Sequence, residues 1–142
     1  MDIHYTEESV EAVADELLKS LTLHEGGATV VGLSGDLGAG KTTLVKAIAT
    51  KLSISETVTS PTFVIAKYYD TQDENFQKLI HIDAYRIEDI TELDPLGWET
   101  MIGSPKTLIV LEWPEKIEGA LPLSTTRFSI NHTTEGRHIS QI

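Results

Sequence analysis

The sequence contains no cysteine among its 142 residues. Disulfide bonds and thiolate-held metal sites are therefore excluded, and the composition is compatible with the cytoplasm, where we expect the protein to act. No apolar run approaches the ~20 residues that a membrane-spanning helix needs. The acidic first residues, "MDIHYTEESV", also lack the basic and apolar regions of a secretory signal peptide. We expect no association with a membrane.

Positive charge is also scarce, because 11 basic residues face 22 acidic ones and the net charge is −11. A protein of this sign repels phosphate backbones, which disfavours stand-alone binding of nucleic acids. The acidity is explained by solubility, although it would also suit a basic protein partner. The chain is otherwise of ordinary globular composition, and its length predicts a single domain over residues 1–142.

Hydrophobic periodicity predicts an α/β protein with a mostly parallel central sheet flanked by helices. Helices are expected at residues 6–21, with Thr6 as N-cap, at 42–52 and, more briefly, at 95–103. Strands are expected at residues 28–35, 60–70, 78–83 and 107–113. The segments 125–133 and 138–142, joined by a polar turn, predict an antiparallel C-terminal hairpin.

The stretch "GDLGAGKT", residues 35–42, matches the phosphate-binding pattern G-x-x-x-x-G-K-[ST]. Its glycines allow the backbone N–H groups to curl into an anion nest, and the next helix adds its positive N-terminus. Lys41 would reach the β- and γ-phosphates, Thr42 would ligate Mg²⁺, and Thr43 would contact the α-phosphate. The alternative is a plain glycine turn, but a chance match in this chain has a probability of about half a percent. The loop predicts a P-loop NTPase, and the missing N-K-x-D pattern favours adenine.

Two predicted strands end on a carboxylate, "KLIHID" on Asp83 and "TLIVLE" on Glu112. Ligands of open α/β sheets bind at the carboxyl ends of the strands, so both side chains are candidates to face Mg²⁺ and the γ-phosphate. One would bind the metal while the other orients the attacking water, and the sequence leaves the assignment open. The alternative is that each acid caps the next element. Thr62, after the turn Ser60-Pro61, is a further hydroxyl within possible reach of the metal.

Other polar and aromatic residues carry weaker signals. Trp113 either covers the nucleotide, faces a partner or fills the core. Arg86 either contacts phosphate or a partner, or forms a structural salt bridge. The histidines have no metal-ligand spacing and receive no predicted role; they are His4, His24, His81, His132 and His138.

Four motifs in this order, "GDLGAGKTT", "SPTF", "HIDAYR" and "LEWPEKIEGALP", resemble the bacterial TsaE (YjeE) ATPases. The resemblance runs from the first helix to Leu121-Pro122. It implies a P-loop sheet with helices on both sides and an ATP-binding, ATP-hydrolysing protein. It further implies a requirement for threonylcarbamoylation of adenosine 37 in tRNAs that read ANN codons. The implied partners are TsaB and TsaD, with tRNA contacted indirectly through their complex.

The resemblance also carries roles to individual positions. It implies Mg²⁺ ligation by Thr42 and Glu112, catalysis by Lys41, Asp83 and Glu112, and a place near the base for Thr6. Thr62 would lie in a switch-like segment, and the chain after residue 123 carries no family motif. The implied nucleotide contacts of the loop are Asp36, Leu37, Gly38, Ala39, Gly40, Lys41, Thr42 and Thr43.

Two other functions fit the same loop. A small-molecule kinase would need an acceptor site and a lid rich in arginine, which the three arginines of the chain disfavour. A binding module would use ATP as a conformational latch without productive hydrolysis. For the ATPase, no arginine finger is evident, so we expect slow turnover alone and completion of the site by a partner surface.

Overall fold

The computed structural model describes residues 1–59 and 65–142, so the predicted Thr62 and the turn before it lie outside the described residues. The first half contains strand β1 (Asp2–Tyr5), the 3-10 helix η1 (Glu7–Ser9), α1 (Val10–Ser20), β2 (Thr29–Ser34) and α2 (Lys41–Lys51). The second half contains β3 (Ala66–Asp70), β4 (Lys78–Asp83), η2 (Ile90–Leu96), α3 (Trp98–Ile102), β5 (Thr107–Glu112), η3 (Pro114–Ala120), β6 (Thr126–His132) and β7 (Arg137–Gln141).

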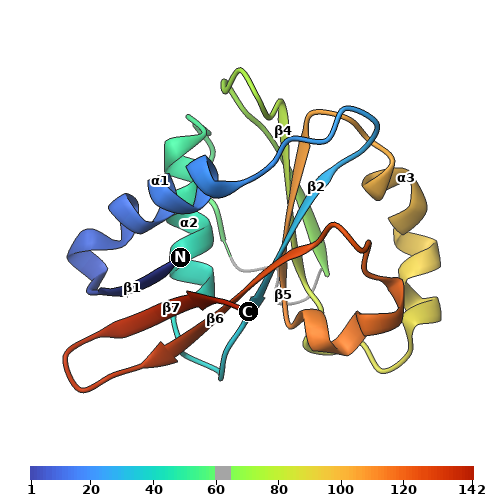
Figure 1. Cartoon of the computed structure of the whole chain (residues 1–142). Coiled ribbons are helices and arrows are strands. Elements are labelled where there is room, and N and C mark those ends of the chain that lie inside the picture. Colours follow the sequence, from blue (N-terminus) through green and yellow to red (C-terminus); the bar gives the residue numbers. More distant parts are fainter. Residues whose placement is uncertain (60–64) are drawn as a thin grey trace.

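The strands of the described chain form one mixed sheet in the order β1-β7-β6-β2-β5-β4-β3 (Figure 1). The inner strands β6, β2, β5 and β4 run parallel to one another. The pairings β1–β7, β7–β6 and β3–β4 are antiparallel. The prediction of a mostly parallel sheet is therefore too strong, since both sheet edges are antiparallel.

Helices cover both faces of the sheet, with α1 and α2 on one face and α3 with its neighbouring 3-10 helices on the other (Figure 1). Strand β5 shows why both faces need a covering layer, because its side chains alternate between two hydrophobic clusters on opposite faces. Leu108 and Val110 belong to the cluster that contains α1 and α2 residues. Ile109 and Leu111 belong to the cluster around Trp98 of α3. A strand buried on both faces reads as the continuous apolar run that the sequence shows.

Most of the predicted elements are present within a residue or two of their expected bounds. The hairpin β6–β7 is antiparallel as predicted, and Thr6 is the N-cap of η1, which leads into α1. The predicted helix over 95–103 divides at Gly97, whose φ of +78° ends η2 and begins α3. No strand was predicted at residues 2–5, where β1 pairs with β7.

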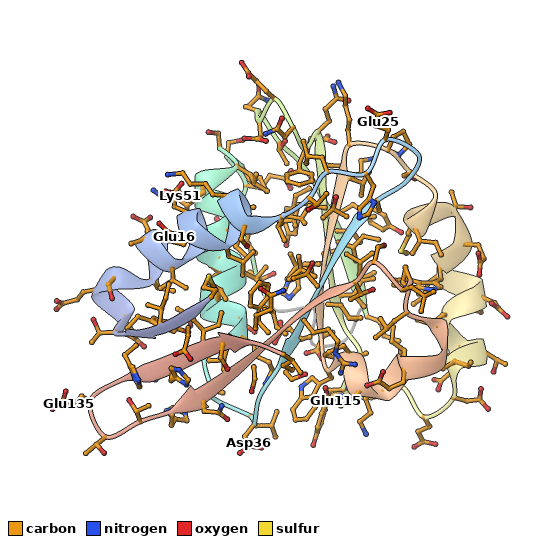
Figure 2. All side chains as sticks on the ribbon, in the orientation of Figure 1. Glu16, Glu25, Asp36, Lys51, Glu115 and Glu135 are labelled. Atoms are coloured by element: carbon orange, nitrogen blue, oxygen red, sulfur yellow. The ribbon has the colours of Figure 1, made fainter. Side chains whose placement is uncertain are left out.

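The acidic charge is spread over the surface. Figure 2 shows Glu16, Glu25, Glu115 and Glu135 at separate places on the outside of the ribbon. This distribution agrees with a general contribution of the acidic residues to solubility. Among the described residues, no helix has the length and apolar character needed to cross a membrane.

Candidate functional site

The glycine loop joins β2 to α2 at the carboxyl end of the parallel strands. Gly38 and Gly40 have φ angles of +78° and +105°, which favour glycine, so the loop can curl as predicted. Gly40 is the N-cap of α2, and the first backbone N–H groups of a helix have no partner inside the helix. The loop and the helix together form the kind of N-terminus that binds phosphate.

Lys41 lies at the start of α2 with only 4% of its surface exposed. Its Nζ donates hydrogen bonds to the carbonyls of Gly35 (2.5 Å) and Asp36 (2.9 Å). The same ammonium group lies 4.5 Å from the centre of the Trp113 ring. Burial lowers the pKa of Lys41, and the nearby Glu112 and Asp83 carboxylates oppose that shift. The described residues give Lys41 carbonyls and a ring as close partners, which leaves its charge available to an anion.

Trp113 follows the last residue of β5 and has a left-handed backbone, with φ +62° and ψ +52°. This conformation is uncommon for a bulky residue and accompanies the sharp turn from β5 into η3. Its ring also contacts Tyr85, with 5.0 Å between the ring centres. Trp113 therefore lies between the loop lysine and an exposed tyrosine, and it also packs against the hydrophobic cluster around Trp98.

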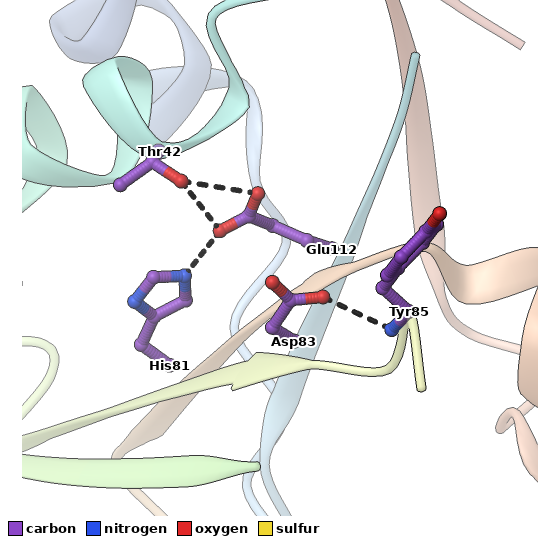
Figure 3. Close-up of polar contacts among 5 residues, drawn as sticks. All are labelled: Thr42, His81, Asp83, Tyr85 and Glu112. Atoms are coloured by element: carbon purple, nitrogen blue, oxygen red, sulfur yellow. Dashed lines mark hydrogen bonds and ion pairs between the residues drawn. The ribbon is translucent and has the colours of Figure 1, made fainter. Parts of the chain in front are cut away.

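Glu112 is the central carboxylate of the site and is 3% exposed (Figure 3). The Thr42 hydroxyl of α2 donates to it, with Oγ1 at 3.2 Å from Oε1 and 3.1 Å from Oε2. From the neighbouring strand β4, Nε2 of His81 lies 2.6 Å from Oε2. Three elements that are distant in sequence thus converge on one carboxylate.

Asp83 lies beside Glu112, because the two residues are paired in the parallel register of β4 and β5. Its Oδ1 accepts a hydrogen bond from the backbone N–H of Tyr85 at 3.0 Å (Figure 3). Burial raises the pKa of Asp83, and the adjacent Glu112 charge acts in the same direction. The Tyr85 N–H opposes this shift. Asp83 is less buried than Glu112, and in the described part of the chain the Thr42 hydroxyl bonds to Glu112 and not to Asp83, so the two acids occupy distinct positions.

A cavity of about 410 Å³ opens over these groups. This volume lies within the range typical of ligand pockets, and the cavity suits a nucleotide that extends partly into solvent. Its lining includes eight of the predicted site residues, namely Leu37, Gly38, Gly40, Lys41, Thr42, Thr43, Asp83 and Glu112. It also includes Ile65, Tyr85, Arg86, Trp113 and Arg137.

Three predicted nucleotide contacts do not line this cavity. Ala39 is buried in the core cluster below α1 and α2. Asp36 contributes its backbone carbonyl to Lys41, while its side chain lies on the outside of the ribbon (Figure 2). Thr6 lies at the turn of the C-terminal hairpin, where its methyl group is 3.4 Å from the position a Cβ would take on Gly136.

The C-terminal hairpin, which carried no motif, packs against the glycine loop. Nε2 of His132 lies 2.7 Å from the carbonyl oxygen of Gly38. Arg137 donates from Nη1 to Nδ1 of His132 at 3.3 Å, and its Nη2 lies 4.0 Å from the Glu7 carboxylate. A Cβ on Gly40 would lie only 2.4 Å from Nε of Arg137. Two of the three arginines line the cavity, namely Arg86, which was a candidate for phosphate contact, and Arg137, which was not.

No role was predicted for His81, whose Nε2 contacts the Glu112 carboxylate. A signal was present, because His81 is two residues before Asp83 in the strand "KLIHID" and strands repeat every two residues. That spacing puts both side chains on the same face of β4. Metal-ligand spacing was the wrong criterion for a histidine that touches a carboxylate.

The oxygen donors at this site fit Mg²⁺. The Thr42 hydroxyl and the Glu112 carboxylate are hard oxygen ligands that already lie together, with Asp83 adjacent. The described residues contain no cluster of three or more His, Cys, Asp or Glu able to hold a metal without help. Mg²⁺ at nucleotide sites takes one or two protein ligands and completes its shell with phosphate and water, so this small donor set is the appropriate one.

Comparison with known proteins identifies the family. The family model described as "Threonylcarbamoyl adenosine biosynthesis protein TsaE" matches residues 4–139. The chain belongs to the TsaE family. The match includes the C-terminal hairpin, so this family extends beyond the stretch over which motifs could be recognised in the sequence.

Individual TsaE proteins support the same assignment. The chain is 33% identical over 122 residues to "tRNA threonylcarbamoyladenosine biosynthesis protein TsaE" of Haemophilus influenzae, which covers 86% of this chain and 75% of the relative. It is 43% identical over 93 residues to the Bacillus subtilis protein of that name, covering 66% of this chain and 55% of the relative. The crystal structure of Bacillus subtilis YdiB superposes with a TM-score of 0.75 and 28% identity, covering 99% of this chain and 83% of that one. The TsaE chain described here therefore has the α/β fold of that structure.

Proposed function

We propose that this TsaE protein is a Mg²⁺-dependent ATPase required for threonylcarbamoylation of adenosine 37 in tRNAs that read ANN codons. The observation that carries the ATPase part is the meeting of Lys41, Thr42 and Glu112 at the mouth of a glycine loop. A helix N-terminus, a buried lysine and a hydroxyl–carboxylate pair are the groups that phosphoryl transfer requires. Family membership supports the tRNA part.

In this proposal the loop and Lys41 bind the phosphates. Lys41 would exchange the Gly35 and Asp36 carbonyls for phosphate oxygens, which are stronger acceptors because they are charged. Its lowered pKa arises from burial, so an anion in the cavity would stabilise the ammonium form. The positive end of α2 would add to the same attraction.

Thr42 and Glu112 would hold the metal, whose bound form neutralises charge that develops on the phosphate oxygens. Because Glu112 occupies the position next to Thr42, Asp83 becomes the candidate for orienting the attacking water. Asp83 is the more accessible of the two acids and keeps one oxygen engaged by the Tyr85 N–H. The other oxygen would accept a hydrogen bond from water.

The C-terminal hairpin would complete the nucleotide site. Arg137 lines the cavity beside Gly40 and offers a guanidinium group that cannot lose its charge. Thr6 and Glu7 meet the same hairpin, which makes a place for Thr6 near the base or ribose compatible with the packing.

We further propose that TsaB and TsaD are the partners and that their contact accelerates slow intrinsic turnover. Two large apolar residues at the cavity, Leu37 and Tyr85, are 67% and 42% exposed and would be covered on assembly. A cytoplasmic location also belongs to this proposal. Phosphate release measured with and without TsaB and TsaD tests the partner effect, and equal rates would contradict it.

The test of the whole function is restoration of tRNA modification. Extracts depleted of this protein should lose threonylcarbamoyladenosine in ANN-reading tRNAs and regain it with wild type but not with Lys41→Ala. Lys46→Ala is the matched control, because Lys46 is an exposed lysine in the second turn of α2. Restoration by Lys41→Ala would exclude a role for the phosphate site. Phosphate release by wild type but not Glu112→Ala separates an ATPase from a latch, since a latch releases no phosphate in either protein.

A further inference from the structure

His81 is a fully buried histidine below the proposed metal site. It lies on β4 at 0% exposure, and its Nε2 is 2.6 Å from Oε2 of Glu112. Its other ring nitrogen, Nδ1, is buried and has no hydrogen-bond partner among the described residues. Leaving a buried polar atom without a partner costs free energy. The contact with Glu112 therefore accounts for a histidine, and not an apolar residue, at this buried position.

The chemistry of the pair fixes which atom donates. An ionised carboxylate only accepts hydrogen bonds, so Nε2 carries the proton and donates it to Glu112. Nδ1 takes no part in this contact, so Nε2 is the ring atom through which His81 acts on Glu112. The neighbours of His81 along β4, Ile80 and Ile82, are buried on the opposite face of the sheet.

The Thr42 and His81 bonds hold Glu112 from two directions. Thr42 approaches from α2 and spans both carboxylate oxygens, whereas His81 approaches from β4 and contacts Oε2 alone (Figure 3). The Thr42 hydroxyl would have to turn when its oxygen ligates a metal. His81 lies on a strand paired along its length with β5, so its donor would stay in place during that change.

We infer that His81 is a positioning residue, whose Nε2–H group holds the Glu112 carboxylate in the orientation that receives a divalent cation. This inference rests on the proposed function, in which Glu112 is the metal ligand. Hydrogen bonds from the second layer orient metal-binding carboxylates, and their loss typically reduces metal affinity by about 10–100-fold. His81 would act through Glu112 and would not touch the cation or the nucleotide.

A pair of substitutions separates positioning from packing. His81→Gln retains an amide N–H near the place of Nε2, while His81→Met has a similar length and no donor. The measurement is calorimetric titration of ADP at a series of Mg²⁺ concentrations, repeated without Mg²⁺. We expect His81→Met to raise the half-saturating Mg²⁺ concentration by about 10–100-fold, with ADP affinity in the absence of Mg²⁺ unchanged. His81→Gln should stay within about threefold of wild type.

The outcomes distinguish this inference from the proposed function. If His81→Met keeps the wild-type Mg²⁺ requirement, or if both variants lose affinity equally, the positioning role is wrong while the ATPase proposal stands. If wild type itself binds ADP without any influence of Mg²⁺, the proposed metal site fails and the inference with it. Should His81→Met unfold, His81→Asn takes its place in the same titration, because its shorter amide cannot reach Glu112. A wild-type Mg²⁺ requirement in His81→Asn would then overturn the inference.

Discussion

The Thr42 hydroxyl of α2 donates to both carboxylate oxygens of Glu112 at the end of β5, at 3.2 and 3.1 Å. These residues are 70 positions apart in the sequence. The parallel pairing of β2 with β5 explains their meeting, because it puts Leu33 opposite Glu112 and so brings the loop after β2 to the end of β5. The fold thus brings together two oxygen-bearing groups of the kind that bind Mg²⁺, which are the metal ligands of the proposed function.

Removing the Thr42 hydroxyl should impair Mg²⁺-dependent binding selectively. Thr42→Val has nearly the same shape but no oxygen ligand, and it also leaves Glu112 without its α2 donor. We expect the affinity for ADP in the presence of Mg²⁺ to fall by roughly tenfold or more. Thr42→Ser, which retains the hydroxyl, is the control and should bind nearly as well as wild type. Equal binding by Thr42→Val in a fluorescence or calorimetric assay would contradict metal ligation here.

Gly40→Ala should damage the loop without unfolding the protein. The new Cβ would meet Arg137 at 2.4 Å, and the φ of +105° disfavours any side chain at this position. We expect a loss of nucleotide affinity of at least about tenfold, since the loop and Arg137 must both shift. Gly26→Ala is the matched control, because a Cβ there meets nothing within 4 Å. Unchanged nucleotide affinity in Gly40→Ala would show that this loop conformation is not needed for binding.

Asp83→Asn should make the protein more stable near neutral pH while abolishing phosphate release. Burial raises the pKa of Asp83, so the folded state holds this proton to higher pH than the unfolded chain does. The free energy of unfolding therefore falls as the pH rises from the ordinary carboxyl pKa through the raised one. Above the raised pKa, the protein remains less stable than it would be with a neutral side chain at position 83. Asparagine cannot ionise, and the variant should melt roughly 1–3 °C above wild type at about pH 7. The difference should vanish below about pH 4, where the wild-type carboxyl is protonated.

Scanning calorimetry at the two pH values checks this prediction. Asp94→Asn serves as the control, because Asp94 is exposed and lies away from the cavity lining. An Asp83→Asn variant that melts below wild type at neutral pH would mean that the ionised carboxylate stabilises the fold. Retained phosphate release in this variant would separately exclude Asp83 as the group that orients water.

The local features of this fold were readable from the sequence. The loop "GDLGAGKT" and the apolar strands β2, β4 and β5 carry strong short-range patterns. Asp83 and Glu112, which end β4 and β5, lie side by side at the carboxyl ends of these strands, as predicted. Strand β1 was missed because it is only four residues long and its pairing is with β7, at the far end of the sequence. The helix predicted over residues 95–103 is broken at Gly97, and this break was missed because it depends on the left-handed backbone of that glycine.

Two residues of the site, His81 and Arg137, were not predicted, because their positions depend on contacts that no local sequence pattern encodes. The bond between His81 and Glu112 requires the register of β4 against β5. The approach of Arg137 to Gly40 requires the strand order β7-β6-β2, which brings the C-terminal hairpin beside the loop. A scarcity of arginine in the sequence said nothing about where the few present would lie.

Arg137→Gln should weaken nucleotide binding and reduce its dependence on salt. The guanidinium lines the cavity beside the loop, and glutamine retains polar contacts without the charge. We expect a loss of roughly three- to tenfold in ADP affinity at low ionic strength, shrinking as salt screens the wild-type charge. Lys116→Gln is a suitable control, because Lys116 lies over Tyr85 and outside the cavity lining. Equal losses in both variants would indicate a general charge effect instead of a contact.

The central claim is that Lys41 and the loop around Gly40 bind the phosphates of ATP together with Mg²⁺. Calorimetric titration of purified protein with a non-hydrolysable ATP analogue in millimolar Mg²⁺ tests it most directly. We expect wild type and Lys46→Met to bind the analogue at one site per chain. Lys41→Met should lose at least about 100-fold in affinity, because charge-assisted hydrogen bonds to phosphate are strong. No binding heat from wild type at any of several temperatures, or the same affinity in Lys41→Met, would contradict it.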